Sequence, residues 1–245
     1  MLHSRISVTV AVLASGAALL AAASPSRAAG PICGEGTYSY AGFALGSGSH
    51  GVSATIEQIG SLDVRAGHVA GWIGVVDPVT GNAWLQVGLS ALPGNATSQI
   101  YYEVARPGGA PVYRDVRRFI ASGEPHRFAV LELARRPGWW RVWVDGVPMT
   151  APIHLRGSHN RWTAQVLGES WAGATTGACN GYAYSFSGVS LYDAAYRNLA
   201  GLGGVARTDP DYIVTRYSRS SFLAASISGA SSGSKPAYPP PAKNA

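Results

Sequence analysis

Apolar residues recur at every second position in several short segments of the chain. Residues 182–191 show this pattern, because Tyr182, Tyr184 and Phe186 fall on one face of an extended strand. Val, Ile, Trp, Tyr and Phe are frequent in these segments and Gly or Pro separates them, which is typical of β-strands. We predict strands at residues 51–59, 68–76, 83–89, 100–104, 127–133, 139–144, 162–167 and 182–191.

One turn can be predicted from its sequence. The dipeptide Asp145-Gly146 separates Val144 from Val147 and is a strong signal for a two-residue β-hairpin. Few segments show the periodicity of a helix. Eight or more strands in about 155 residues predict an all-β domain, an antiparallel two-sheet sandwich or jelly roll, with a core large enough to be stable alone.

The two ends of the chain differ from this segment. A short basic start precedes an apolar run from residue 6 to about residue 23, and the small residues Ser26 and Ala28 follow, as in a signal peptide cleaved after Ala28. A membrane anchor is the alternative, but the run is short and polar residues interrupt it. We therefore expect a secreted, extracellular protein, free of the membrane after cleavage. Its expected parts are a signal peptide (1–28), a β-sandwich domain (29–195) and a low-complexity, partly disordered extension (196–245).

Charge and cysteine content refine this picture. Cleavage removes Arg5 and Arg27 and no acidic residue, so the net charge falls from +6 to +4. The remaining arginines are scattered, which argues against nucleic-acid binding. Cys33 and Cys179 both lie in the exported part, where an oxidising environment favours a disulfide bond between them. Such a bond closes a loop of roughly 145 residues and contributes about 4–5 kcal/mol in the chain-entropy model. Two free buried thiols are the alternative.

Several kinds of active site are not indicated. The histidines at positions 50, 68, 126, 154 and 159 lack the spacing of metal ligands, so we expect neither a metal nor a cofactor. Residues 168–172 resemble a nucleophile elbow but lack its final glycine and its α/β context. No predicted strand carries the paired carboxylates of a retaining jelly-roll glycosidase. Glu132, the one acid of its strand, is expected at the surface.

Two polar residues stand out in apolar strands. Gln86 lies within the segment 83–89, and Glu169 follows the apolar residues 166–168 and precedes Trp171. A buried amide or carboxylate must find partners. At these residues the chain resembles the glutamic peptidases (eqolisins), a family with a concanavalin-like sandwich and a catalytic Gln–Glu dyad.

The resemblance covers roughly residues 38–195 and rests on short motifs that occur in the family's order. Residues 40–42 are similar to its Trp-Ala-Gly, 71–74 to its Trp-Val-Gly strand, 85–88 to its Leu-Gln-Thr-Gly, 102–103 to its Tyr-Glu pair, 164–169 to its Ala-Glu-Trp-Ile-Val-Glu and 184–189 to its closing Phe-Gly-Thr-Val. Gln86 lies fourteen residues after Trp72 and 83 residues before Glu169, as in the family. The chain departs at Val76 and Ser90, where the family has acids, and at Val166, where it has Trp.

The resemblance implies a monomeric endopeptidase that acts on polypeptides without a cofactor. Glu169 is then the general base that activates a water molecule, and Gln86 donates to the carbonyl oxygen. The implied substrate-binding residues are Trp72, Trp84, Tyr102, Glu103 and Trp171. The alternative is a non-catalytic concanavalin-like carbohydrate-binding or cell-envelope protein, in which Trp139, Trp140 and Trp143 form a platform for sugar rings.

Overall fold

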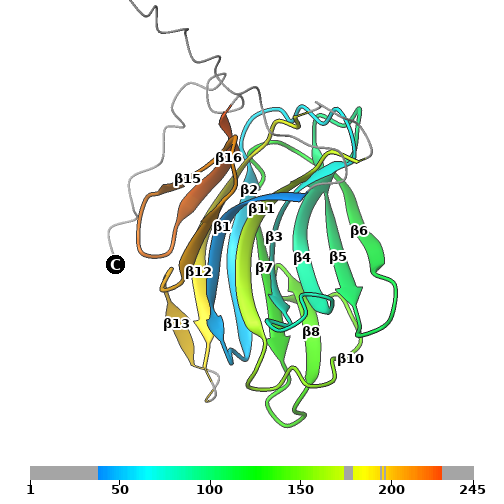
Figure 1. Cartoon of the computed structure of the whole chain (residues 1–245), viewed down its shortest axis with the longest axis vertical. Coiled ribbons are helices and arrows are strands. Elements are labelled where there is room, and N and C mark those ends of the chain that lie inside the picture. Colours follow the sequence, from blue (N-terminus) through cyan, green and yellow to red (C-terminus); the bar gives the residue numbers. More distant parts are fainter. Residues whose placement is uncertain (1–37, 174–178, 194, 196, 228–245) are drawn as a thin grey trace, which may run out of the picture. The chain divides into compact units, whose positions relative to one another are not determined.

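The computed structural model describes residues 38–173, 179–193, 195 and 197–227 (Figure 1). The predicted signal peptide, Cys33 and the end of the C-terminal extension lie outside these residues, so the cleavage site and the disulfide bond remain predictions. Within the described residues, no helix has the length and apolar character needed to cross a membrane.

The described residues form two antiparallel sheets, which confirms the predicted all-β sandwich (Figure 1). The strands of the first sheet lie in the order β14 (Val205–Thr208), β1 (Tyr38–Ser47), β11 (Thr163–Trp171), β3 (His68–Val76), β4 (Trp84–Ala91), β5 (Ser98–Ala105) and β6 (Val112–Ile120). We call it the cleft sheet. Those of the second, the back sheet, lie in the order β10 (Ile153–His154), β8 (Trp139–Val144), β7 (His126–Glu132), β2 (Gly51–Gln58), β12 (Ala183–Tyr192), β16 (Phe222–Ser226) and β15 (Tyr212–Arg216). Two short strands, β9 (Val147–Pro148) and β13 (Asn198–Ala200), pair with β8 and β12.

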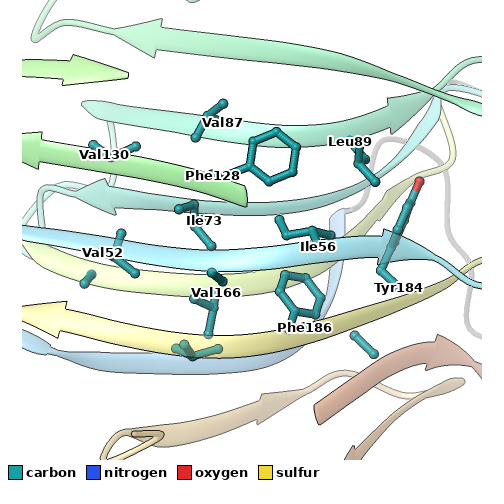
Figure 2. Close-up of a cluster of buried hydrophobic side chains, with 14 of the residues drawn as sticks. Val52, Ile56, Ile73, Val87, Leu89, Phe128, Val130, Val166, Tyr184 and Phe186 are labelled. Atoms are coloured by element: carbon teal, nitrogen blue, oxygen red, sulfur yellow. The ribbon is translucent and has the colours of Figure 1, made fainter. Parts of the chain in front are cut away.

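The core lies between the two sheets, where their apolar faces meet. Figure 2 shows Ile73 and Val87 of the cleft sheet close to Ile56 and Phe128 of the back sheet, and all four side chains are fully buried. Burying such a side chain contributes roughly 1.5–3 kcal/mol. The strict alternation along these strands leaves every second residue of the cleft sheet pointing away from the core, and those residues build the candidate site.

All eight predicted strands are present, with ends that shift by up to four residues. The predicted hairpin is confirmed: Val144 pairs with Val147, and both turn residues have positive φ, 50° at Asp145 and 79° at Gly146. These angles fit the type I′ turn that joins twisted strands.

The sandwich extends further along the chain than predicted. Strands β13 to β16 lie between Asn198 and Ser226, in the segment expected to be a low-complexity extension. Phe222 and Ala224 point into the core and are fully buried, which explains why a segment rich in Ser and Arg still joins the back sheet. The β-sandwich domain therefore does not end at residue 195.

Glu132 is buried, which contradicts the expectation that it lies at the surface. It ends β7, where Phe128 and Val130 also point inward, so the alternation places its side chain on the core face. Its carboxylate accepts a hydrogen bond from the backbone N–H of Gly138. A buried carboxylate with a donor of this kind satisfies part of its need for partners.

Candidate functional site

A cleft of about 650 Å³ opens on the outer face of the cleft sheet. This volume lies within the range typical of small-molecule and cofactor sites. The outward-pointing residues of the central strands line it: Ala70 and Trp72 of β3, Gln86 and Ser90 of β4, Tyr101 and Glu103 of β5, and Gln165 and Glu169 of β11. Tyr38, Tyr40, Trp84, Tyr113 and Arg207 are also among the lining residues, so much of the wall is aromatic.

Glu169 is held by two donors from the neighbouring strand β3. Nε1 of Trp72 donates to Oε2 over 2.9 Å, and Nε2 of His68 lies 2.8 Å from Oε1. The register explains this arrangement, because Glu169 lies opposite Ala70 and the residues two positions before and after Ala70 point to the same face. The Glu169 side chain is 7% exposed, so the carboxylate is nearly buried but reaches the cleft. Each oxygen retains a further lone pair that a water molecule can use.

Gln86 is held by partners on β5. Its Nε2 donates to the hydroxyl of Tyr101 over 3.1 Å and to Oε2 of Glu103 over 3.0 Å. Gln86 and Glu103 lie directly opposite each other in the ladder between β4 and β5. Burial raises the pKa of the Glu103 carboxyl, and the negative charge of Glu169 raises it further. The charge of Glu169 therefore disfavours ionisation of Glu103.

Gln86 and Glu169 line the same cleft but do not lie on adjacent strands. Strand β3 separates them, since Gln86 pairs with Gly74 and Glu169 with Ala70. Trp72, midway between these two positions of β3, donates to Glu169. The dyad that the resemblance implies therefore spans the three strands β4, β3 and β11.

The other predicted site residues divide into three groups. Trp72, Trp84 and Glu103 line the cleft. Trp171 lies beside it, where its ring stacks on Tyr38 with centroids 5.9 Å apart. Tyr102 does not belong to the site, because it packs against the core. The alternation of β5 instead directs its neighbours Tyr101 and Glu103 to the cleft.

Two positions depart from the family motifs, and the structure shows what occupies them. Ser90 lies in register with Ala70 and so with Glu169, and its Oγ is 2.7 Å from the hydroxyl of Tyr113. Next to Val76, Asp77 lines the cleft. The backbone N–H of Val79 and the hydroxyl of Thr80 donate to Asp77 and lower its pKa.

Sequence reasoning missed several residues of the cleft. His68 shares the face of Trp72 in the predicted strand 68–76, and this shared face is a sequence signal that identifies it as a cleft residue. Arg207 lies on β14, which was not predicted, and its guanidinium lies 3.9 Å from the ring centroid of Tyr40. No signal in the sequence identifies that contact.

The predicted sugar platform is not a single surface. Trp140 is fully buried and its Nε1 donates to Ser158. Trp139 and Trp143 point to the other side of β8, as alternation requires. The guanidinium of Arg136 lies 4.2 Å from the ring centroid of Trp139, which leaves little free ring face there.

Comparison with known proteins identifies the class of fold. No protein-family model matches this sequence, and no curated protein matches it. Among solved structures, scytalido-glutamic peptidase bound to a peptide-based transition-state analogue is similar with a TM-score of 0.58 and 16% identity, over 79% of this chain and 100% of that chain. SCP-B, a member of the eqolisin family in complex with the tripeptide Ala-Ile-His, is similar with a TM-score of 0.55 and 15% identity, over 79% of this chain and 100% of that one. The protein therefore has the concanavalin-like sandwich of the eqolisins, as the motifs imply.

Proposed function

We propose that this protein is a secreted glutamic-type endopeptidase that hydrolyses peptide bonds with Gln86, Glu169 and an activated water molecule. The observation that carries the proposal is the nearly buried carboxylate of Glu169, held by two donors in a cleft of about 650 Å³ that also contains Gln86. The eqolisin-like fold supports it, because two solved structures with this fold contain peptide-type ligands.

Glu169 supplies the general base in this mechanism. Its carboxylate takes a proton from a water molecule as the water oxygen bonds to the scissile carbonyl carbon. The protonated Glu169 then gives the proton to the amide nitrogen, the C–N bond breaks, and a carboxylic acid and an amine leave. Trp72 and His68 hold the carboxylate in one orientation throughout.

Gln86 supplies the donor for the carbonyl oxygen, where negative charge develops. Both N–H groups of its amide are engaged, one with Tyr101 and one with Glu103, so the substrate oxygen must replace one of these acceptors. Protonation weakens Glu103 as an acceptor, and the raised pKa of this carboxyl brings protonation closer to neutral pH. Acidic conditions should therefore favour productive binding.

Digestion of casein or a peptide library by the mature protein, from about pH 3 to about pH 8, tests the proposal. Glu169→Gln should abolish turnover, and Gln86→Ala should lower the rate by about 10²–10³. Glu57→Gln is the matched control, because Glu57 lies on β2 of the back sheet and should leave turnover unchanged. Serine and cysteine reagents should also have no effect, since no side-chain nucleophile takes part. Absence of cleavage, or full activity of Glu169→Gln, would overturn the proposal and favour the carbohydrate-binding or cell-envelope alternative.

Secretion can be tested separately. The composition of the first residues predicts cleavage after Ala28, so material recovered from the medium should begin near Ala29. N-terminal sequencing measures this directly. An intact Met1 in the medium would contradict the signal peptide.

A further inference from the structure

Three side chains that are far apart in the sequence meet at one end of the back sheet. His50 precedes β2, Glu132 ends β7, and His159 lies between β10 and β11. The pairing of β2 with β7 brings the first two together, because the N–H of Glu132 donates to the carbonyl of His50 over 2.8 Å. One imidazole nitrogen of each histidine and one carboxylate oxygen of Glu132 lie within 4.8 Å of one another.

Both histidines contact the carboxylate of Glu132. Nδ1 of His50 lies 2.6 Å from Oε2, and Nδ1 of His159 lies 3.0 Å from both Oε1 and Oε2. The side chains of His50 and Glu132 are 2% and 0% exposed, whereas that of His159 is 38% exposed. The cluster is therefore a buried carboxylate and imidazole, and solvent reaches it from the His159 side.

The contact of Nε2 of His50 determines which nitrogen of a neutral imidazole ring carries the hydrogen. Nε2 lies 2.6 Å from Oδ1 of Asn160, so an N–H at Nε2 donates to that amide oxygen. In a neutral imidazole, Nδ1 then carries a lone pair, which faces the lone pairs of Glu132 Oε2 at 2.6 Å. Two acceptors at this distance require a cation between them, either a proton or a metal ion. An amide or carbonyl oxygen that accepts from the far nitrogen is also the usual way in which a metal-bound histidine is oriented.

We propose that His50, Glu132 and His159 bind a divalent transition-metal ion of the zinc class. Two imidazoles and one carboxylate are a ligand set that zinc accepts, and a water molecule can complete the tetrahedron from the exposed His159 side. Bond lengths of about 2.0–2.2 Å place tetrahedral ligand atoms about 3.3 Å apart, so the histidine nitrogens move outward by a few tenths of an ångström when the ion binds. Sequence spacing gave no sign of this site, because the fold assembles it from three separate segments.

This site is separate from the proposed peptidase centre. None of its three residues is among those that line the cleft around Glu169. An ion here joins the residue before β2, the end of β7 and the segment before β11. Its expected effect is on stability, since an ion that binds the folded state alone raises the melting temperature.

Zinc titration of chelator-treated mature protein tests the proposal, with bound zinc measured by elemental analysis and stability by thermal melting. The wild type should bind one zinc ion per chain and its Tm should rise with zinc concentration. His159→Gln removes a ligand at a partly exposed position and should weaken binding by about 100-fold or more. His154→Gln is the matched control: this exposed histidine on β10 stacks on Trp139, outside the cluster, and its loss should not alter zinc affinity.

Asn160 gives a second, independent test. Asn160→Gly removes the acceptor for His50 Nε2 and should weaken zinc binding by about 10–100-fold. Glycine suits the position because Asn160 has a φ of 56°. Circular dichroism should confirm that all variants are folded. If the folded wild type binds no zinc, or if His159→Gln binds it as tightly as His154→Gln does, a proton and not a metal ion links His50 to Glu132, and the proposal is overturned.

Discussion

Trp72→Phe tests the assembly of the candidate site without any substrate. The substitution keeps an aromatic ring in a position that is 6% exposed and removes the indole N–H that donates to Glu169 over 2.9 Å. The lost bond is charge-assisted, and one oxygen of a nearly buried carboxylate is left with fewer partners.

The expected loss in stability has two parts. A hydrogen bond to a charged group contributes about 1.5–3 kcal/mol, and the smaller ring buries less apolar surface, which costs about 1 kcal/mol more. The free energy of unfolding should therefore fall by about 2.5–4 kcal/mol at neutral pH. Urea denaturation measures it as a lower midpoint with an unchanged slope.

Trp143→Phe is the matched control. Trp143 is half-buried on β8, and its Nε1 has no hydrogen-bond partner among the described residues. Removing a buried N–H that lacks a partner costs little and can stabilise the folded state. We therefore expect a change within about 1 kcal/mol for this variant. Equal losses for the two variants would show that the Trp72–Glu169 bond contributes nothing, and would refute the reasoning.

Three further predictions concern charge, packing and the disulfide bond. Burial raises the pKa of Glu103 in the folded state, so ionisation of this group destabilises the fold. Glu103→Gln should therefore be more stable than wild type at pH 7. Urea denaturation below about pH 4, where the carboxyl is protonated in both states, should show no such advantage. Gly71→Ala should lower the free energy of unfolding by about 1–3 kcal/mol, since an added Cβ would lie 2.6 Å from Cγ of the fully buried Tyr184. Thiol titration of the unfolded, unreduced mature protein should detect no free thiol, because Cys33 and Cys179 are predicted to be joined; two free thiols would contradict this.

The strands that could be predicted are those that the sandwich buries. Strands β3 and β4 carry continuous apolar residues on the core face, so β-branched and aromatic residues identify them. The strands that were missed lie mainly at sheet edges. Strand β6 carries four charged residues, and all four residues of β14 are exposed. An edge strand pairs through its backbone with a single neighbour. Such a strand needs no regular pattern of apolar residues, so the sequence does not reveal it.

The candidate site could be predicted only one residue at a time. Gln86 and Glu169 were detectable because each is polar among apolar neighbours, and both prove to be nearly buried. Their partners were not detectable, because the contact between His68 and Glu169 joins positions 101 residues apart and depends on the register of β3 against β11. A single sequence does not encode that register in any local pattern.

The same reasoning explains the buried carboxylate of Glu132 and shows how it could have been recognised. Every second residue of β7 points to the same face of the sheet. A strand that buries Phe128 and Val130 therefore also directs Glu132 inward. Glu132 is the one acid of this strand, and a buried carboxylate requires hydrogen-bond donors or a cation as partners. An acid at an inward position of an apolar strand therefore indicates a site. The partners of that acid come from other segments that only the fold brings near, here His50 and His159.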